Sequence, residues 1–286
     1  MDEMTMSMRE AAVKAWVGIW YVMYVVLRVL LRVLIGRHRR EWIQSVLELH
    51  YTRAYSIRYG QLCGTPSEPA VSRVIHRVFR KYGAKTFIDV GAFIGLHTIY
   101  ACKFMKERRG TVIVALEPDP KNYAVLKRKT TQFSSVKTMN VACYTKDDEE
   151  IEFHLGCRDS SGLSPMGTIR PIFLHPSYYF KKELLQDTIV VKTVRLDTLI
   201  RKMGFSIVDL IKMDIQGAEY LVLTDPTLDL SKVKNLIVEV HYRYGTRESN
   251  EIVRSLIDKG FKVTALYPNE QENYWYLLAY RGKMPW

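Results

Sequence analysis

Three ionisable side chains at the ends of two predicted strands could carry acid–base chemistry. Asp214 directly follows the apolar stretch 208–213, and Glu239 and His241 end the stretch 234–241 with one residue between them. Because side chains two residues apart on a strand share a face, Glu239 and His241 point the same way. A carboxylate can orient a substrate hydroxyl, and an imidazole that titrates near neutrality can take its proton. Asp214, His241 and Glu239 are therefore the candidate catalytic residues.

Other roles for these side chains stay open. His241 can equally be a surface imidazole at a strand end, and Glu219 can equally stabilise the helix that it begins through the helix dipole. Lys212 can pair with a carboxylate of the site or extend toward solvent. Asp214, Glu239 and His241 could converge on a divalent cation, but carboxylates and imidazoles are common at strand ends without one. We therefore expect no metal ion.

A glycine-containing turn earlier in the chain predicts a cofactor site. The segment Thr86-Phe-Ile-Asp-Val-Gly-Ala-Phe-Ile-Gly-Leu-His-Thr98 has the pattern of an apolar strand, a turn with Gly91 and Gly95, and a helix start. Glycine permits positive φ and close approach of a ligand, and a helix start offers unpaired N–H groups. The spacing is neither that of dinucleotide enzymes nor that of a triphosphate-binding loop. Asp89 would repel a diphosphate but not a cationic ligand, which favours S-adenosylmethionine.

A second carboxylate supports the same ligand. The apolar stretch 111–116 ends at Glu117, and another predicted helix follows. An acidic side chain at the carboxyl end of the second strand can accept hydrogen bonds from both ribose hydroxyls, and it excludes a 2′-phosphate. The predicted cofactor-binding residues are Asp89, Gly91, Gly95 and Glu117.

The order of these elements resembles the FkbM-type methyltransferases. The resemblance covers about residues 65–282, and its most specific segment is similar to the family's Lys-x-Asp-x-Glu-Gly-x-Glu signature. The matching segments are Phe87-Ile-Asp-Val-Gly-Ala-Phe-Ile-Gly95, Leu116-Glu-Pro-Asp-Pro-Lys-Asn-Tyr123, Val194-Arg-Leu-Asp-Thr-Leu199 and Val208-Asp-Leu-Ile-Lys-Met-Asp-Ile-Gln-Gly-Ala-Glu219. The resemblance implies S-adenosylmethionine as cofactor and, as in most members, O-methylation of a sugar or polyketide hydroxyl.

Two positions depart from the family's pattern. Phe93 stands where the turn usually has Asn, and Gln216 stands where the signature usually has Glu. Gln216 keeps its hydrogen-bonding power, but it has no charge and cannot transfer a proton. We place Gln216 and Glu219 on the substrate side of the site.

Length and composition favour one large domain with an amino-terminal addition. The chain has 286 residues, of which 48% are hydrophobic, and we divide it into a helical region 1–60 and a methyltransferase domain 61–286. The four cysteines are scattered and form no C-x-x-C pair, so we expect neither disulfides nor a zinc site. The formal charge of +12 is spread along the chain without an RNA-binding signature, which argues against a nucleic-acid partner.

Strands that alternate with helices predict a Rossmann-like α/β fold with a mostly parallel sheet. Beyond the strands that precede Gly91 and Glu117, the expected strands lie at about 136–142, 150–155, 189–196, 208–214, 234–241, 261–267 and 273–281. The expected helices lie at about 67–82, 96–107, 120–130, 197–203, 217–224 and 247–259. The last two strands have no helix between them, which predicts an antiparallel carboxyl-terminal edge. The resemblance implies that residues 159–180 form a mobile lid over the substrate, and a plain surface loop is the alternative.

The first 60 residues predict a membrane-associating helix. Residues 15–35 are nearly unbroken apolar sequence, with Trp16 and Trp20 near one end and Arg28 and Arg32 near the other. Arginines that meet anionic headgroups and tryptophans at the boundary suit a helix lying in the membrane interface. The alternative is an amphipathic helix that packs on the domain or on a second subunit of a homo-oligomer. We expect a cytoplasmic, membrane-associated enzyme.

Together these patterns predict an S-adenosylmethionine-dependent methyltransferase acting on a hydroxyl of a glycan or lipid-linked acceptor. Three alternatives stay open: a nucleic-acid methyltransferase, a non-catalytic membrane scaffold with a degenerate cofactor site, and a nicotinamide-dependent oxidoreductase. The first lacks an Asn/Asp-Pro-Pro-Tyr motif for base amines, and the third is disfavoured by the glycine spacing.

Overall fold

The computed structural model describes residues 69–105, 110–156, 163–164, 167–169, 187–266 and 274–285. The predicted amino-terminal helix and most of the stretch 159–180 lie outside the described residues, so the membrane helix and the lid stay predictions. Among the helices within these ranges, none is both long and apolar enough to cross a bilayer.

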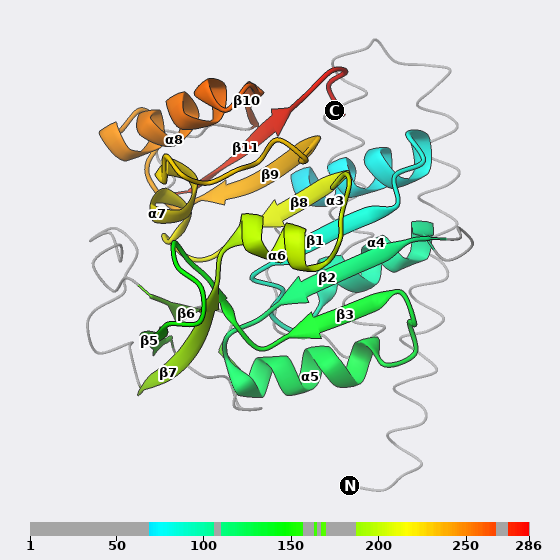
Figure 1. Ribbon diagram of the computed structural model, residues 1–286, viewed down its shortest axis with the longest axis vertical. Coiled ribbons are helices and arrows are strands. Elements are labelled where there is room, and N and C mark those ends of the chain that lie inside the picture. Colours follow the sequence, from blue (N-terminus) through cyan, green and yellow to red (C-terminus); the bar gives the residue numbers. More distant parts are fainter. Residues whose placement is uncertain are drawn as a thin grey trace, which may run out of the picture. The chain divides into compact units, whose positions relative to one another are not determined.

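The main sheet has seven strands and is mixed (Figure 1). Its order is β10 (Lys262–Leu266), β11 (Trp275–Tyr280), β9 (Asn235–Val240), β8 (Leu210–Met213), β1 (Thr86–Val90), β2 (Val112–Leu116) and β3 (Val136–Met139). Neighbouring strands from β9 to β3 are parallel, and β11 is antiparallel to both β9 and β10. The predicted Rossmann-like sheet and its antiparallel carboxyl-terminal pair are confirmed. Because β11 inserts beside β9, β10 forms the edge.

A smaller second sheet departs from the sequence pattern. It runs in the order β4 (Ala142–Cys143), β7 (Asp187–Val194), β5 (Glu150–Leu155) and β6 (Gly167–Thr168). The strands at 150–155 and 189–196 were expected in the main sheet, but they pair antiparallel with each other instead. Exposed and buried residues alternate along β5, which is the pattern of a sheet with one solvated face.

Helices cover both faces of the main sheet, because its central strands are buried on both sides. One face is covered by α3 (Pro69–His76), the π-helical turn η1 (Arg77–Lys81), α4 (Leu96–Met105) and α5 (Pro120–Thr130). The other is covered by α6 (Leu196–Lys202), α7 (Glu219–Thr224) and α8 (Arg247–Asp258). Alternation along β1 explains the division, since Phe87 packs with the first group and Ile88 with the second. The result is a three-layer domain (Figure 1).

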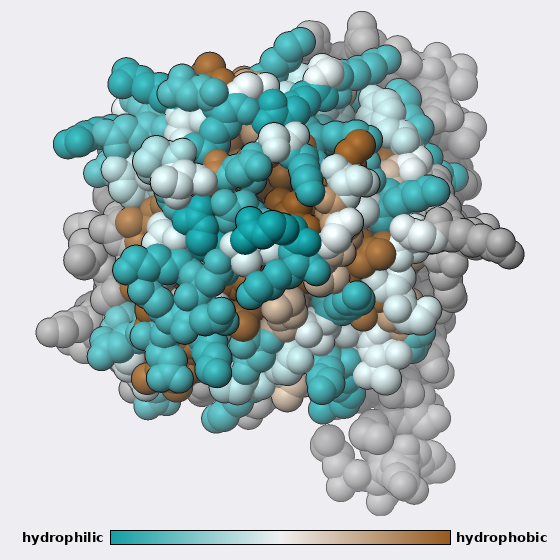
Figure 2. Space-filling model, in the orientation of Figure 1, coloured by the Kyte–Doolittle hydropathy of each residue, from teal (hydrophilic) through white to brown (hydrophobic). Residues whose placement is uncertain are grey.

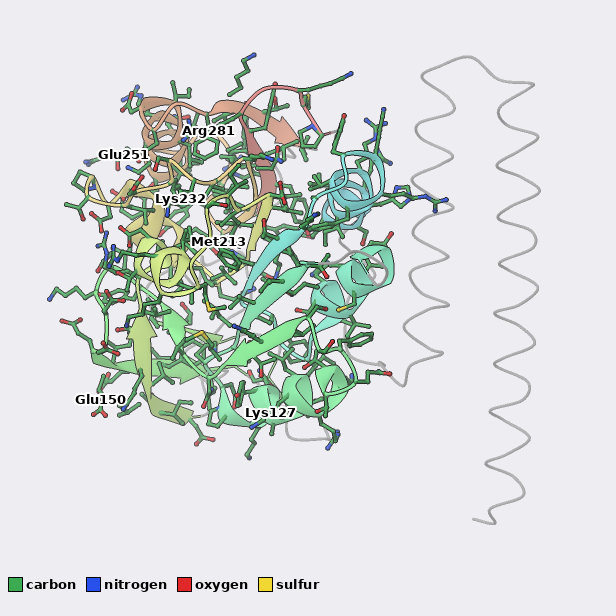
Figure 3. All side chains as sticks on the ribbon, turned by 45° about the vertical axis from the view of Figure 1, so that its right-hand side comes forward. Lys127, Glu150, Met213, Lys232, Glu251 and Arg281 are labelled. Atoms are coloured by element: carbon green, nitrogen blue, oxygen red, sulfur yellow. The ribbon has the colours of Figure 1, made fainter. Side chains whose placement is uncertain are left out.

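Local signals set the helix starts that border the site. Asp119 caps α5 by accepting a hydrogen bond from the Lys121 backbone N–H at 2.8 Å, and Pro120 occupies the first helical position. These local signals explain why the sequence predicts the bounds of α5. In the interior, Met213 at the end of β8 is fully buried, whereas Lys127 and Glu150 point outward (Figure 3).

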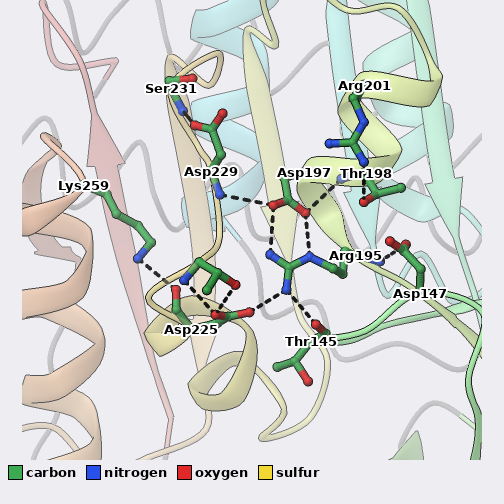
Figure 4. A network of polar contacts seen from close by, with 11 residues as sticks. Thr145, Asp147, Arg195, Asp197, Thr198, Arg201, Asp225, Asp229, Ser231 and Lys259 are labelled. Carbon is green, nitrogen blue, oxygen red and sulfur yellow. Dashed lines mark hydrogen bonds and ion pairs between the residues drawn. The ribbon is translucent and has the colours of Figure 1, made fainter.

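A charged network joins the second sheet to the main domain (Figure 4). The Arg195 guanidinium lies 2.9 Å from an Asp197 carboxylate oxygen and 2.7 Å from an Asp225 oxygen, and it donates to the Thr145 carbonyl at 2.6 Å. The Arg195 backbone N–H donates to Asp147 at 2.8 Å. Thr145 and Asp147 lie between β4 and β5, so one arginine ties this connection to α6 and to the end of α7.

The surface is mixed in character. The face drawn in Figure 2 is largely hydrophilic, with small hydrophobic areas between polar side chains. The large hydrophobic side chains that are exposed in the described part come from separate elements and loops: Tyr82, Val190, Ile207, Tyr244 and Ile257. Scattered exposed residues of this kind are normal.

Candidate functional site

A pocket opens at the carboxyl ends of β1, β2 and β8, where α/β sheets bind ligands. The space between its walls, with the open mouth included, is about 610 Å³. Its polar lining residues are Glu117, Asn122, Ser164, Asp214 and Gln216. Its larger apolar lining residues are Phe93, Leu116, Val141, Cys143, Phe153, Ile169 and Ile215. This lining suits a ligand with an apolar surface and a few hydrogen-bonding groups.

The two glycines of the turn serve different contacts. Gly91 lines the pocket and has φ +76°, and a Cβ there would lie 1.8 Å from the Asp214 carbonyl oxygen. Glycine is therefore required for the ends of β1 and β8 to approach each other. Gly95 has φ +85° and is buried, and a Cβ there would lie 2.7 Å from Leu126 of α5. Gly91 is placed to meet a ligand, whereas Gly95 lies behind the pocket wall.

Asp89 also lies behind the wall. It is fully buried and does not line the pocket. Its Oδ2 accepts a hydrogen bond from Thr98 Oγ1 at 2.6 Å, and its Oδ1 has no hydrogen-bond partner within the described ranges. The Lys212 Nζ lies 3.8 Å from Oδ1. Asp89 thus adds negative charge beside the pocket, and its direct contact with a cofactor stays a prediction.

Glu117 lines the pocket and is held by three donors. Its Oε2 accepts from the Phe93 backbone N–H at 2.8 Å, and its Oε1 accepts from the Asp119 N–H at 3.1 Å and from Asn122 Nδ2 at 3.2 Å. A carboxylate offers about four acceptor positions, so one remains for a ligand hydroxyl. Burial raises the pKa of Glu117 to about 7, although the three donors act in the opposite direction.

The sequence identifies Glu117 and marks Phe93 as unusual, but it gives Asn122 no role. Asn122 follows the α5 cap in the first turn of the helix, and its side chain also donates to the Ser164 carbonyl at 2.7 Å. Phe93 has φ +51°, a left-handed conformation that is rare for a bulky residue and common for Asn. The backbone of the turn therefore explains why Asn is usual at this position. Phe93 bears a conformational cost there, and its side chain lines the pocket.

Asp214 lies where the sequence pattern places it, at the end of β8 and in the pocket lining. Its Oδ1 accepts a hydrogen bond from Gln216 Nε2 at 3.0 Å, and its Oδ2 lies 3.4 Å from Lys212 Nζ. The Lys212 ammonium also donates to the Gly91 carbonyl at 3.0 Å. Burial alone would raise the pKa of Asp214, but Lys212, His241 and the two side-chain hydrogen bonds outweigh burial and lower it. Asp214 is an ionised acceptor.

His241 lies among three carboxylates. Its Nδ1 is 3.0 Å from Glu219 Oε1, and its Nε2 is 3.5 Å from Glu239 Oε1 and 3.8 Å from Asp214 Oδ1. Burial alone would lower its pKa, but Glu219, Glu239 and Asp214 outweigh burial and raise the pKa to about 10. His241 is therefore protonated at neutral pH. The sequence predicts that His241 titrates near neutrality. In the structure the three carboxylates keep it protonated well above neutral pH.

Glu219 and Glu239 do not line the pocket. Glu219 is fully buried and accepts hydrogen bonds from the Ile215 and Gly217 backbone N–H groups at 3.0 and 2.9 Å. It therefore shapes the turn after β8 as well as holding His241. Glu239 accepts a hydrogen bond from the Tyr276 hydroxyl at 3.1 Å. A direct contact of Glu219 with substrate, or of Glu239 with reacting atoms, stays a prediction.

Three of these side chains have the spacing of a cation site. Asp214, Glu219 and His241 each present one ligand atom within 4.8 Å of the others. The imidazolium of His241 and the ammonium of Lys212 already balance part of this negative charge. The expectation that the site works without a metal ion stays a prediction.

Comparison with known proteins places this pocket in a sequence family. The chain matches the family described as the methyltransferase FkbM domain over residues 89–263. It is 27% identical over 215 residues to the 2-O-methyltransferase NoeI of Sinorhizobium fredii, an alignment covering 72% of this chain and 85% of that protein. It is 26% identical over 194 residues to the 31-O-demethyl-FK506 methyltransferase FkbM of Streptomyces tacrolimicus, covering 62% and 72%.

Among solved structures, the chain is similar to the O-methyltransferase from Bacillus cereus in complex with SAH. The TM-score is 0.43 at 13% identity, and the match covers 90% of this chain and 97% of that one. The family match is the more informative, because residues 89–263 contain every polar residue that lines the pocket.

Proposed function

Because the chain belongs to the FkbM methyltransferase family and depends on S-adenosylmethionine, we propose that it methylates a hydroxyl of a glycan or lipid-linked acceptor. The names of both curated relatives specify transfer to oxygen, and one names position 2 of its acceptor. A lipid-linked acceptor would agree with the apolar amino-terminal stretch 15–35. The pocket supports the proposal because its lining combines polar and apolar residues.

The residues around Glu117 fit the cofactor. The remaining acceptor position of the Glu117 carboxylate suits a ribose hydroxyl, and Gly91 brings backbone to the same pocket. Apolar side chains such as Val141 and Phe153 suit the faces of an adenine ring. The bound cofactor supplies a methyl group already activated by its sulfonium. The protein has to align the acceptor oxygen, exclude water and accept a proton.

The observation that carries the proposal is the position of Asp214. Its carboxylate is ionised, lines the pocket and is held by Lys212 and Gln216. It can accept a hydrogen bond from the acceptor hydroxyl and keep that oxygen in line for attack. His241 is protonated at neutral pH, so we assign proton acceptance to Asp214 and electrostatic support of its charge to His241.

The test is transfer of labelled methyl from S-adenosylmethionine to glycan and lipid extracts, read as a mass increase of one methyl group. Asp214→Asn should reduce turnover by about 100-fold or more while S-adenosylhomocysteine affinity stays within about twofold of wild type. The matched control is Asp148→Asn, the same change at a side chain that is 84% exposed. Label in RNA or DNA and not in glycan or lipid would instead support a nucleic-acid methyltransferase.

We also propose that residues 15–35 bring the enzyme to a cytoplasmic membrane surface. Anionic lipid attracts each nearby arginine by about 1 kcal/mol. Changing Arg28 and Arg32 to Gln should therefore weaken flotation of the full chain with anionic vesicles but not with neutral ones. If wild-type protein floats with neither vesicle type, the result would instead support packing of this helix on the domain or on a second subunit.

A further inference from the structure

One wall of the pocket is built around the short strand β6. Ser164, which precedes β6, Gly167 within it and Ile169 directly after it all line the pocket, and we call these three residues the second-sheet wall. β6 has two residues and lies at the edge of the second sheet, next to β5. Such a short edge strand has few ladder hydrogen bonds, so its position depends on further contacts.

The first of these contacts is a two-way pairing of Asn122 with the Ser164 backbone. Asn122 Nδ2 donates to the Ser164 carbonyl at 2.7 Å, and Asn122 Oδ1 accepts from the Ser164 N–H at 3.3 Å. The same amide, which has two N–H groups, also donates to Glu117 Oε1 at 3.2 Å. Asn122 and Ser164 are both buried, so loss of the pairing would leave polar groups that water cannot easily satisfy. The second-sheet wall is thereby tied to the carboxylate that we assign to the ribose.

The second contact joins β6 to the turn after β8. Thr168 Oγ1 donates to the Gln216 backbone carbonyl at 2.8 Å, and Gln216 lies two residues after Asp214. Thr168 is buried, but it is not among the residues that line the pocket. The second-sheet wall thus has one anchor beside Glu117 and another beside Asp214.

We propose that Asn122 and Thr168 are positioning residues, which hold the second-sheet wall in the place where it contacts the bound cofactor. This inference rests on the proposed function, because the pocket is assigned to the cofactor there. A wall that is in place before the ligand arrives needs less ordering on binding, so an anchor can raise affinity without touching the ligand. Asn122 lines the pocket and Thr168 does not, so Thr168 gives the cleaner test.

The affinity for S-adenosylhomocysteine, measured by calorimetry on the full chain, tests the role of Thr168. Thr168→Val removes the hydroxyl but keeps the shape of the side chain, and it should weaken binding by about 3–10-fold. Thr168→Ser keeps the hydroxyl and should stay within about twofold of wild type. The matched control is Thr193→Val in β7, since Thr193 is equally buried and donates to the Lys146 carbonyl at 2.8 Å, away from the pocket lining. The control should leave the affinity unchanged.

Amide hydrogen exchange without ligand tests whether the two anchors hold one wall. Thr168→Val should speed exchange of the Ser164 N–H, which bonds to the other anchor, by about threefold or more. Asn122→Ala should in turn speed exchange of the β6 N–H groups, and it keeps the proposal testable if Thr168→Val does not fold. Thr193→Val should change neither rate.

Equal affinity in wild type and Thr168→Val, an equal loss in Thr168→Ser, or unchanged exchange at the opposite anchor would each overturn the proposal. So would a faster Ser164 exchange in Thr193→Val as large as that in Thr168→Val. Absence of S-adenosylhomocysteine binding by wild type would instead contradict the assignment of the pocket to the cofactor. The two failures are therefore distinguishable.

Discussion

The imidazole of His241 and the carboxylate of Glu219 form a buried ion pair, with Nδ1 3.0 Å from Oε1. The Glu219 side chain is fully buried, and the His241 side chain is 13% exposed. The same carboxylate binds the backbone N–H groups of the turn that carries Gln216. The shape of that turn and the charge of the imidazolium therefore depend on one residue.

The first prediction concerns His241 and stability. A histidine whose folded pKa is raised stabilises fully below its unfolded pKa of 6.5, and this contribution is lost as pH rises toward about 10. The free energy of unfolding of wild type should fall between pH 7 and pH 10, by an amount on the order of a few kcal/mol. His241→Gln should show a much smaller fall in urea titrations over this range. Parallel curves for the two proteins would mean that His241 is neutral in the folded state.

The affinity for the cofactor should vary with pH, because Glu117 ionises in the neutral range. Its pKa is raised to about 7, and the ionised carboxylate accepts a stronger hydrogen bond from a ribose hydroxyl than the protonated carboxyl group does. The affinity for S-adenosylhomocysteine should therefore rise about tenfold from pH 6 to pH 8. Glu117→Gln is the matched control, since its amide does not titrate in this range, and its affinity should be flat. Equal slopes in calorimetry for both proteins would place the titrating group elsewhere.

Phe93 should be replaceable with a gain in stability. Its φ of +51° is costly for Phe but accessible to Asn. Phe93→Asn should raise the free energy of unfolding by about 1 kcal/mol, measured from the urea midpoint. Phe93→Leu keeps an apolar side chain and the backbone cost, so it should give no gain. A gain in the Leu variant as large as in the Asn variant would show that the backbone conformation is not the cause.

Substitution of Arg195 should lower the free energy of unfolding more than substitution of an exposed charged residue. Its side chain is 18% exposed and faces Asp197 and Asp225, each 13% exposed. Arg195→Ala removes the cation that both carboxylates share, although uncharged donors such as the Thr198 and Thr227 backbone N–H groups remain, and it should cost about 3–5 kcal/mol. The comparison is Lys202→Ala, whose pair with Asp148 is 60% and 84% exposed and should be worth less than about 1 kcal/mol. Similar losses in both variants would mean that the network in Figure 4 does not stabilise the fold.

Local patterns explain what the sequence could predict. The strand, turn and helix around Gly91, the acidic residue at 117 and the helix bounds 120–130 all follow from residues within a few positions of one another. Asp214, Glu239 and His241 were placed together because parallel strands end at one edge of the sheet.

Contacts between residues far apart in the chain explain what the sequence could not predict. Glu219 and His241 are 22 positions apart, and the protonation of the imidazole depends on how closely their two elements approach. The bond from Thr168 to Gln216 spans 48 positions and needs the second sheet, which no periodicity separates from the first. The left-handed backbone at Phe93 was indicated only by the Asn that is usual at this position, because Phe itself rarely adopts that conformation.

The most direct test of the account is a calorimetric titration of S-adenosylhomocysteine into the full chain at pH 8, with Glu117→Ala and Asp148→Asn beside wild type. Wild type and Asp148→Asn should each show one saturable site. Glu117→Ala should lose about 10–150-fold in affinity, because hydrogen bonds to a charged group contribute about 1.5–3 kcal/mol. Absence of binding by wild type, or unchanged affinity in Glu117→Ala, would contradict the assignment of this pocket to the cofactor.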